Sequence, residues 1–538
     1  MNFLKRQTYM DYIWWQKGII YQVYPRSFQD SNGDGIGDLQ GIINRLDYFE
    51  WLGIDAIWIS PIYPSPMADF GYDISDYKDI HPIFGNMDDF DKLIKEVHER
   101  GLKLILDLVP NHTSEEHLWF KESRSSRTSS KRDWYLWKDP SHDGGPPNNW
   151  LSVFGGSAWQ WDENTSQYYY HAYLKEQPDL NWRNIEVQKA MFEVMHFWLD
   201  KGVDGFRVDV MWHMIKDEKW RNNPANPDHK EGMSPYNSLI PSYSVDQPEV
   251  HEVVAKMRSV VNKYDDRVII GEIYLPIHQL VTYYGMAQQG AHLPFNFHLI
   301  TLPWDAREIA LAIDQYEGAL PDQSWPNWVL GNHDKPRIAS RAGLEQIKVA
   351  AILLLTLRGT PTLYYGDEIG MQNVNITTKE AQDPWEKNVP GIGLGRDPVR
   401  TPMQWDNTEN GGFSTGKPWL PLPENYKTVN VKKQQEDPSS TLSLYQRLIS
   451  IRRKEKALHV GSYVPIPQEG NLLAYIRKAE GASLLIILNF GSKPASFRSE
   501  QVKLKGKILV ASDLSKEGQE TEEIIAIGGN EGLVIKII

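Results

Sequence analysis

Two apolar runs of the sequence end in residues that can take part in nucleophilic and acid–base chemistry. The first run carries Arg207 and Asp209 two positions apart, and the second is followed by Glu272. Residues two apart on a strand point to the same face, and a neighbouring guanidinium favours an ionised carboxylate. The glycine before Glu272 lets other groups approach closely, and a carboxyl that is buried away from water can have its pKa raised toward neutrality. Taken alone, Arg207 and Asp209 would better suit a structural ion pair, but together with Glu272 the two carboxyls predict a nucleophile and a proton donor.

Polar residues also follow two other apolar runs. Asn111 and His112 come after one of them, and Asn332, His333 and Asp334 come after the other. Parallel strands bring their carboxyl ends to one edge, which is where the active sites of (β/α)8 barrels lie. We therefore expect these side chains to meet the carboxyl pair if the strands are parallel.

A repeated pattern predicts the elements that position these residues. Three amphipathic helices each stop at a glycine, Gly53, Gly101 or Gly202, and each is followed by a short apolar strand. Glycine suits the left-handed position that ends a helix, and alternating helices and apolar strands indicate a parallel sheet. Eight candidate strands follow this pattern: Ile19–Tyr24, Ala56–Ile59, Leu104–Leu106, Phe206–Asp209, Val268–Ile270, Leu293–Phe295, Trp328–Leu330 and Thr362–Tyr364.

The predicted fold class is α/β, a (β/α)8 TIM barrel, since eight strands are the number that closes such a barrel. An open doubly wound sheet is the alternative, but its usual glycine-rich nucleotide loop after the first strand is missing. Two segments do not fit the pattern and predict an inserted subdomain after strand 3 and a C-terminal antiparallel β-domain. The predicted division is 1–112 and 178–460 for the barrel, 113–177 for the insertion and 461–538 for the β-domain.

Composition excludes several classes of function. The 538 residues contain no cysteine, which excludes disulfides and thiolate chemistry and agrees with a reducing compartment. A net charge of -13 disfavours nucleic acid as a partner. The sequence has no run of about 18 apolar residues that could span a bilayer. Met1–Lys17 also lacks the apolar core of a secretory signal. We therefore expect a cytoplasmic protein without a membrane role. A neutral small molecule is the expected ligand, and the oligomeric state is left open.

Four motifs in order along the chain resemble the signature regions of the α-amylase clan: Asp107-Leu108-Val109-Pro110-Asn111-His112, Gly205-Phe206-Arg207-Val208-Asp209, Gly271-Glu272 and Gly331-Asn332-His333-Asp334. Two further motifs resemble its oligo-1,6-glucosidase and α-glucosidase branch. These are Gln177-Pro178-Asp179-Leu180-Asn181 and the segment from Arg396 to Trp405. The resemblance covers nearly the whole chain.

This resemblance implies a role for each matching residue. Asp209 is expected to be the nucleophile, Glu272 the general acid/base and Asp334 the carboxylate that holds two sugar hydroxyls. The first glucose subsite is expected to contain Asp69, Tyr72, His112, Arg207, His333 and Arg400. Displacement by one carboxylate with protonation by the other gives a covalent intermediate and net retention.

The implied activity is that of a retaining α-glucosidase that releases glucose from the non-reducing end of short α-glucosides. Transglucosylation is an additional activity that the resemblance allows. Three long segments, Thr113–Gln177, Trp212–Pro248 and Met371–Arg400, are expected to converge over the barrel rim and close one end of the site. A closed end favours exo-action over the open groove of an amylase.

Two other functions remain open. A glucosyl-transferring isomerase, of the isomaltulose or trehalose synthase type, shares the first chemical step. A non-catalytic transporter subunit of this branch would need a transmembrane helix and would not need all three carboxylates. Linkage preference is also open, because Val210 resembles α-1,6-acting members whereas Ile273–Pro276 departs from their pattern.

A loop after the first strand predicts a structural Ca²⁺ or Mg²⁺ site. Asp30, Asn32, Asp34 and Asp38 supply oxygens on alternate residues, and the Ile36 carbonyl completes the set that the resemblance implies. The loop is not a full EF-hand, because Gly41 stands where the twelfth-position glutamate would be. A polar turn without metal is the alternative.

Overall fold

Eight parallel strands form the central sheet of the computed structural model, which describes residues 12–498 and 505–537. Their order is β10, β11, β1, β2, β3, β7, β8, β9, and a parallel bridge between Asn296 and Trp328 closes the sheet into a barrel. The strands are Ile20–Val23 (β1), Ala56–Ile59 (β2), Lys103–Leu108 (β3), Gly205–Val208 (β7), Val268–Gly271 (β8), Leu293–Pro294 (β9), Asn327–Val329 (β10) and Thr360–Tyr364 (β11). The predicted (β/α)8 barrel is confirmed.

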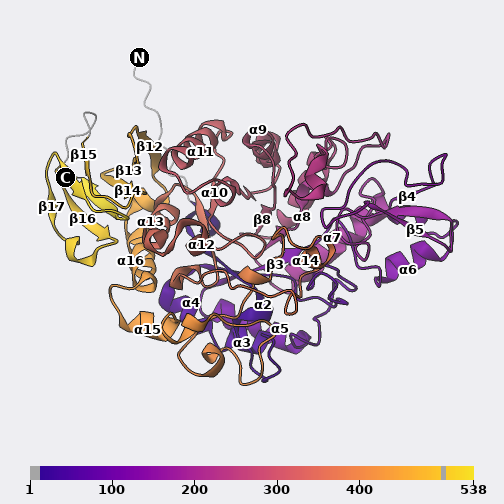
Figure 1. Cartoon of the computed structure of the whole chain (residues 1–538), viewed down its shortest axis with the longest axis horizontal. Coiled ribbons are helices and arrows are strands. Elements are labelled where there is room, and N and C mark those ends of the chain that lie inside the picture. The colour runs from indigo at the N-terminus through magenta and orange to yellow at the C-terminus, as the bar shows by residue number, and fades with distance from the viewer. Residues whose placement is uncertain (1–11, 499–504, 538) are drawn as a thin grey trace, which may run out of the picture.

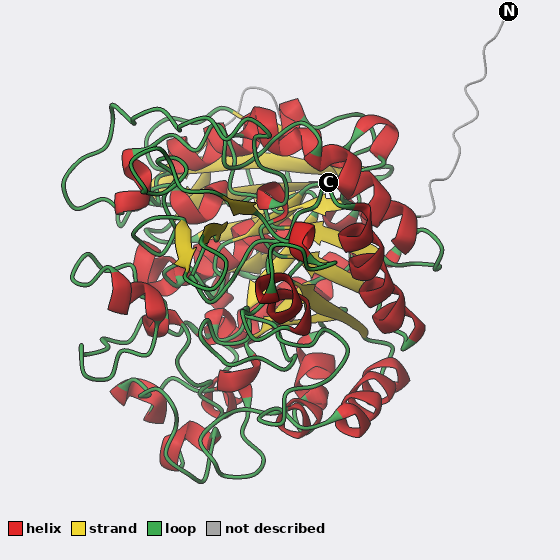
Figure 2. Ribbon diagram, turned by 90° about the vertical axis from the view of Figure 1, so that its right-hand side faces the viewer, coloured by secondary structure: helices red, strands yellow, loops and turns green. Residues whose placement is uncertain are grey.

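Helices connect the strands and surround them, as Figure 2 shows. The three glycines predicted at helix ends, Gly53, Gly101 and Gly202, adopt φ angles of 90°, 70° and 101°, in the left-handed region that glycine tolerates best. The main helices are Leu39–Ile43 (α3), Leu46–Leu52 (α4), Met87–Glu99 (α5), Ile185–Asp200 (α7), Val250–Val261 (α8), Ala306–Ala319 (α11), Ile347–Thr356 (α13) and Thr441–Lys454 (α16).

The barrel strands are buried on both faces, which explains their continuous apolar sequences. Alternate residues of neighbouring strands, such as Trp58, Ile105 and Ile270, share one cluster with Phe295 and Val329 inside the barrel. The residues between them pack in a second, larger cluster that includes helix residues. Because both faces are apolar, the charged residues of these segments are concentrated at the strand ends.

Two additions lie at opposite ends of the molecule's long axis in Figure 1. The predicted insertion after strand 3 contains Leu118–Ser125 (α6) and a three-stranded sheet of Trp137–Lys138 (β4), Trp159–Asp162 (β5) and Gln167–Tyr170 (β6). The C-terminal sheet is antiparallel, with the order β12, β13, β14, β19, β16, β17. Its strands are Ser462–Ile466 (β12), Leu472–Ala479 (β13), Ala482–Asn489 (β14), Gly506–Ala511 (β16), Glu520–Thr521 (β17) and Gly532–Ile537 (β19).

Both additions occur where the sequence predicts them, while the exact residues of the domain division stay a prediction. Residues 1–11, which make up most of the N-terminal stretch considered above, lie outside the described part of the chain. Within the described ranges, none of the helices has both the length and the apolar character needed to cross a bilayer.

Candidate active site

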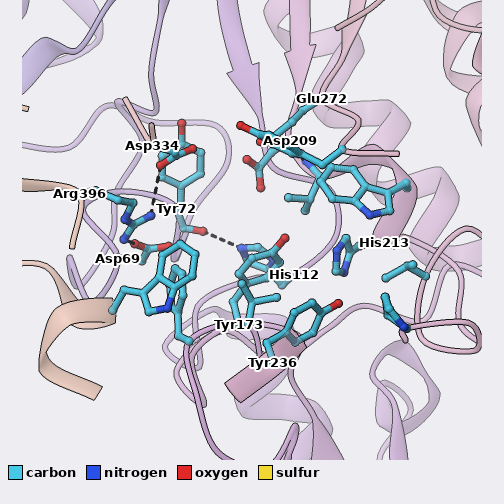
Figure 3. A pocket seen from close by; sticks show the side chains of 18 of the residues that line it. Asp69, Tyr72, His112, Tyr173, Asp209, His213, Tyr236, Glu272, Asp334 and Arg396 are labelled. Carbon is cyan, nitrogen blue, oxygen red and sulfur yellow. Dashed lines mark hydrogen bonds and ion pairs between the residues drawn. The ribbon is translucent and has the colours of Figure 1, made fainter. Parts of the chain in front are cut away.

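A pocket of about 360 Å³ opens at the carboxyl-terminal rim of the barrel strands. Its size falls within the range of roughly 300–1,000 Å³ that is usual for small-molecule sites. Figure 3 shows Asp69, Tyr72, Asp334 and Arg396 together on one side of it, with Asp209 and Glu272 beside them and Tyr236 and His213 farther away. The predicted residues that line the pocket are Asp69, Tyr72, His112, Asp209, Glu272, His333 and Asp334, whereas Arg207 and Arg400 lie behind this lining.

Arg207 connects three carboxyl groups at the ends of neighbouring strands. Its Nη1 donates to Asp107 Oδ1 and to Asp209 Oδ1, each at 2.8 Å, and its Nη2 lies 2.5 Å from Glu272 Oε2. The backbone N–H of Val210 also donates to Glu272 Oε2, at 2.9 Å. Because β3, β7 and β8 are adjacent in the sheet, one guanidinium can reach all three carboxyls.

This sharing changes the electrostatics expected from sequence. Burial raises the pKa of Asp209, the charge of Glu272 raises it further, and the opposing effect of Arg207 is smaller. Burial also raises the pKa of Glu272. Arg207 therefore favours ionisation of Asp209 less than its place in the sequence suggests, since the same guanidinium is divided among three acids. The two carboxyls titrate as a coupled pair.

Asp334 differs from this pair because it has cationic partners of its own. Arg400 Nη2 donates to Asp334 Oδ1 at 2.9 Å, and Arg396 Nη1 lies 3.5 Å from the same atom. Burial opposes ionisation of Asp334, but the neighbouring His333 ring and the two guanidinium groups together outweigh it and hold its pKa well below the usual range. Asp334 is thus a permanent anion at the pocket wall.

Arg396 organises this side of the pocket, and the sequence did not single it out. Its Nη2 donates to Asp69 Oδ1 at 2.6 Å and to Asp383 Oδ1 at 2.7 Å, while its Nε donates to Asp383 Oδ2 at 2.9 Å. Arg396 belongs to a motif quoted above, so its position could have been found there. Asp383 has no comparable signal, because it lies in the long loop after β11.

The two predicted histidines are neutral. Burial lowers the pKa of His112 to about 4 and lowers that of His333 well below its usual value. The ring of His333 lies parallel to that of Tyr72, with centroids 5.4 Å apart, and its Nε2 lies 2.8 Å from the Tyr72 hydroxyl oxygen. Neutral imidazoles both donate and accept hydrogen bonds, which suits contact with hydroxyl groups.

A buried lysine fixes the segment that carries His112. Lys216 donates from Nζ to Asn111 Oδ1 at 2.8 Å and also pairs with Asp179. Asp179 belongs to the quoted motif that follows the insertion, and Gln177 of that motif donates to Asp69 Oδ2 at 3.2 Å. Strand β3, the insertion and the loop after β7 are thereby joined beneath the pocket, which explains why polar residues from distant segments can be buried there.

All three long segments predicted to converge over the rim contribute to the pocket wall. Phe154 and Tyr173 come from the insertion, Trp212 and Tyr236 from the segment after β7, and Trp385 from the segment after β11. The rings of Phe154 and Trp385 are in contact, with centroids 5.2 Å apart. Two of the segments therefore meet directly at the pocket.

The loop after β1 uses most of its predicted metal ligands as hydrogen-bond acceptors. Asp30 accepts from the N–H groups of Asn32, Gly33 and Gly35 and from the Ser414 hydroxyl. Asn32 Oδ1 and Asp34 Oδ1 each accept one loop N–H and keep a free lone pair. Asp38 accepts from Ser31 and caps α3 through Gly41. No group of three or more acidic or histidine side chains positioned for a metal occurs within residues 12–498 and 505–537.

Comparison with known proteins gives the family of the chain. Residues 22–461 match the family described as alpha amylase, catalytic domain. The chain belongs to this family. Among curated relatives, an oligo-1,6-glucosidase of Parageobacillus thermoglucosidasius is 40% identical over 96% of this chain and 97% of its own length. An α-glucosidase of Culex pipiens is 39% identical, over 97% of this chain and 90% of its own length.

Solved structures of the same family share the fold over nearly the full length. An α-glucosyl transfer enzyme superposes with a TM-score of 0.93 at 38% identity and covers 98% of this chain and 100% of its own. The trehalulose synthase from Pseudomonas mesoacidophila MX-45 gives a TM-score of 0.89 at 36% identity, over 98% and 99% of the two chains. The predicted resemblance to the α-amylase clan is thereby confirmed, and the chain is similar to both hydrolases and transferases.

Proposed function

We propose that the protein is a retaining, exo-acting α-glucosidase that acts on short α-glucosides. The observation that carries this proposal is the pair of Asp209 and Glu272 beside the permanently ionised Asp334, within a pocket whose wall three loops help to form. The relatives named oligo-1,6-glucosidase and α-glucosidase support the same activity.

In the proposed mechanism, Asp209 attacks the anomeric carbon while Glu272 gives its proton to the departing glycosidic oxygen. The bond between that carbon and oxygen breaks, and a glucosyl ester of Asp209 forms. Glu272, now ionised, takes a proton from water, whose oxygen attacks the same carbon and releases Asp209. The pair must enter the cycle with one proton, and the raised pKa of both groups lets the pair keep that proton at a higher pH than exposed carboxyls would.

The remaining pocket residues bind the glucose ring. Asp334 holds ring hydroxyls and is itself held by Arg400, His112 and His333 supply neutral hydrogen bonds, and Asp69 is kept in place by Arg396. Tyr72 lines the pocket next to these groups and supplies an aromatic ring for contact with the apolar face of the sugar. Arg207 orients the two reacting carboxyls from behind rather than contacting the sugar.

A closed pocket restricts cleavage to the last sugar of a chain. The test is the time course of products from maltoheptaose. Glucose and the next-shorter oligomer at the first time points support exo-action, whereas early fragments from the middle of the chain would show an open groove and overturn it. The same assay with maltose, isomaltose, sucrose and trehalose decides the linkage preference.

Glucosyl transfer is a second candidate function, favoured by the likeness to an α-glucosyl transfer enzyme and a trehalulose synthase. The two functions differ only in whether water or a sugar attacks the intermediate. Product analysis with sucrose distinguishes them, because an isomerase yields an isomeric disaccharide whereas a glucosidase yields glucose and fructose.

We also propose that the loop of Asp30, Asn32, Asp34, Ile36 and Asp38 binds a structural Ca²⁺ or Mg²⁺. Its donors are hard oxygens, which suit either ion, but Asp30 would have to release hydrogen bonds to coordinate it. Removal of divalent ions is expected to lower the melting temperature while activity at low temperature persists. An unchanged melting temperature, with no ion detected by elemental analysis, would leave the polar turn.

A cytoplasmic location is proposed as well. The lack of cysteine agrees with a reducing compartment. Fractionation of cells that express the full chain tests this, and recovery of the activity outside the cytoplasm would contradict it.

A further inference from the structure

The polar side chains of the pocket differ in whether they have partners. Asp69, His112, His333 and Asp334 all make hydrogen bonds or ion pairs with neighbouring protein groups. Lys335, the next residue after Asp334, also lines the pocket, yet its ammonium makes no hydrogen bond or ion pair within the described part of the chain. An unpaired ammonium among carboxylates is a donor that is available to a ligand.

Aromatic contacts fix where this ammonium lies. Lys335 Nζ is 5.3 Å from the centre of the Tyr274 ring, a distance at which a cation is attracted to an aromatic face. Tyr274 in turn stacks on Phe297, with centroids 4.2 Å apart and planes 8° apart, and its hydroxyl accepts from Asn332 at 3.1 Å. The ring is therefore rigidly held, and it holds the lysine at the pocket wall.

The position of Tyr274 relative to Glu272 indicates which part of a substrate meets this lysine. Tyr274 is two residues beyond Glu272, and the charge of Glu272 is among the causes that raise the pKa of the Tyr274 hydroxyl, after its burial. Glu272 must contact the oxygen between the glucosyl unit and its leaving group. Tyr274 and Lys335 both line the pocket, and neither is among the residues that hold the glucosyl unit in the proposed function.

We propose that Lys335, held by Tyr274, is a specificity-determining residue for the leaving-group sugar and for an acceptor sugar that replaces it. Its ammonium donates hydrogen bonds to hydroxyls of a neutral sugar, and the Tyr274 ring supplies an apolar surface beside them. This inference rests on the proposed glucosidase function and adds to it the residue that decides between sugar and water as acceptors.

The transfer step balances with groups already present. A hydroxyl oxygen of the acceptor sugar attacks the anomeric carbon of the glucosyl ester, and the bond from that carbon to Asp209 breaks. Glu272 takes the proton of the hydroxyl and returns to its acid form. A new glycosidic bond replaces the ester bond, so no additional reagent is needed.

The experiment measures how the intermediate divides between water and sugar. With p-nitrophenyl α-glucoside that is isotopically labelled in its glucosyl unit as donor and unlabelled maltose as acceptor, initial nitrophenol release reports every labelled intermediate formed, and labelled free glucose reports its hydrolysis. Glucose released from maltose carries no label and is not counted. The ratio of labelled glucose to nitrophenol is therefore insensitive to changes in the first step. In Lys335→Met, the maltose concentration that gives half-maximal transfer is expected to rise about tenfold, as for loss of one charge-assisted hydrogen bond.

Two variants serve as controls. Lys335→Arg keeps a cationic donor and is expected to retain most of the transfer. Lys95→Met alters an exposed lysine of α5 and is expected to change neither the ratio of labelled glucose to nitrophenol nor the maltose concentration that gives half-maximal transfer. Transfer to methanol, which is too small to reach the lysine, is expected to be unchanged in Lys335→Met.

Several outcomes would overturn the inference. One is a ratio of labelled glucose to nitrophenol that Lys335→Met leaves unchanged. Another is an equal loss of transfer to methanol and to maltose in that variant. A third is a wild-type preference for glucose 6-phosphate over maltose as acceptor that Lys335→Met abolishes. The last would assign the lysine to an anionic sugar. Failure of the wild type to release nitrophenol would instead refute the proposed function, so the two failures are distinguishable.

Discussion

The inner and outer walls of the pocket are built in different ways. The inner wall consists of Asp69, Tyr72, His112, His333 and Asp334, which are held by Arg396, Arg400 and other buried groups. The outer wall consists of Tyr236, Asn237, Tyr274 and Lys335, which are half-buried or exposed. The Tyr236 hydroxyl and the Lys335 ammonium make no hydrogen bonds with described residues.

This difference indicates that the polar groups of the inner wall have fixed partners before a substrate binds, whereas the Tyr236 hydroxyl and the Lys335 ammonium of the outer wall remain available to a ligand. Buried donors and acceptors with fixed partners can recognise one ligand shape at little cost in conformational entropy. Unpaired groups near solvent can adapt to several ligands. We therefore expect strict selection of the glucosyl unit and broader selection of what is attached to it.

The largest effect is expected from the reacting group of the inner half. Asp209→Asn keeps the size of the side chain but cannot form the glucosyl ester, so hydrolysis of p-nitrophenyl α-glucoside should fall by about 10⁴-fold or more. The melting temperature should not fall, because the change removes a buried charge whose ionisation is disfavoured. Retention of wild-type activity would contradict the nucleophile assignment.

A smaller and substrate-dependent effect is expected at the boundary between the two halves. Glu272→Gln removes the proton donor, and disaccharide hydrolysis should fall by roughly 10²–10⁴-fold. The aryl glucoside should suffer less in its first step, since nitrophenolate leaves without protonation. Comparison of kcat/KM for both substrates measures this, and equal losses would argue against Glu272 as the acid.

The pH profile tests which carboxyl sets each limb. Burial raises the pKa of Asp209, so activity should decline on acidification at a higher pH than an exposed aspartate would give. Burial also raises the pKa of Glu272, which must be protonated when it acts as the acid. In Glu272→Gln, which has no proton to lose, the alkaline limb of kcat/KM for a disaccharide should disappear while the acidic limb stays. An unchanged alkaline limb would show that this limb does not report Glu272.

The smallest effect is expected in the outer half. Tyr236→Phe removes a hydroxyl without a protein partner, so kcat/KM for a disaccharide should fall only about three- to tenfold. Tyr426→Phe changes another half-buried tyrosine, outside the pocket, and should have no effect. A loss as large as that of an inner-wall variant would remove the distinction between the halves.

Periodicity and strand ends were enough to predict the barrel and the catalytic neighbourhood. Apolar runs such as Ala56–Ile59 can be recognised as strands because both faces of a barrel strand are buried. Glycines that end helices, such as Gly53, mark where a helix stops and the next strand follows. Asp209, Glu272 and Asp334 could be predicted to meet because parallel strands carry their ends to one rim.

Tertiary structure alone decided how these charges are paired. Arg207 is adjacent to Asp209 in sequence, but its contacts with Asp107 and Glu272 depend on which strands are neighbours. Arg396 and Asp383 lie in a long loop whose course no local pattern specifies. A pKa depends on burial and on every charge nearby, whereas a sequence records only neighbours along the chain. The sequence by itself therefore determined that Asp209, Glu272 and Asp334 meet at one rim, and only the fold decided which charged groups accompany them and which of them are ionised there.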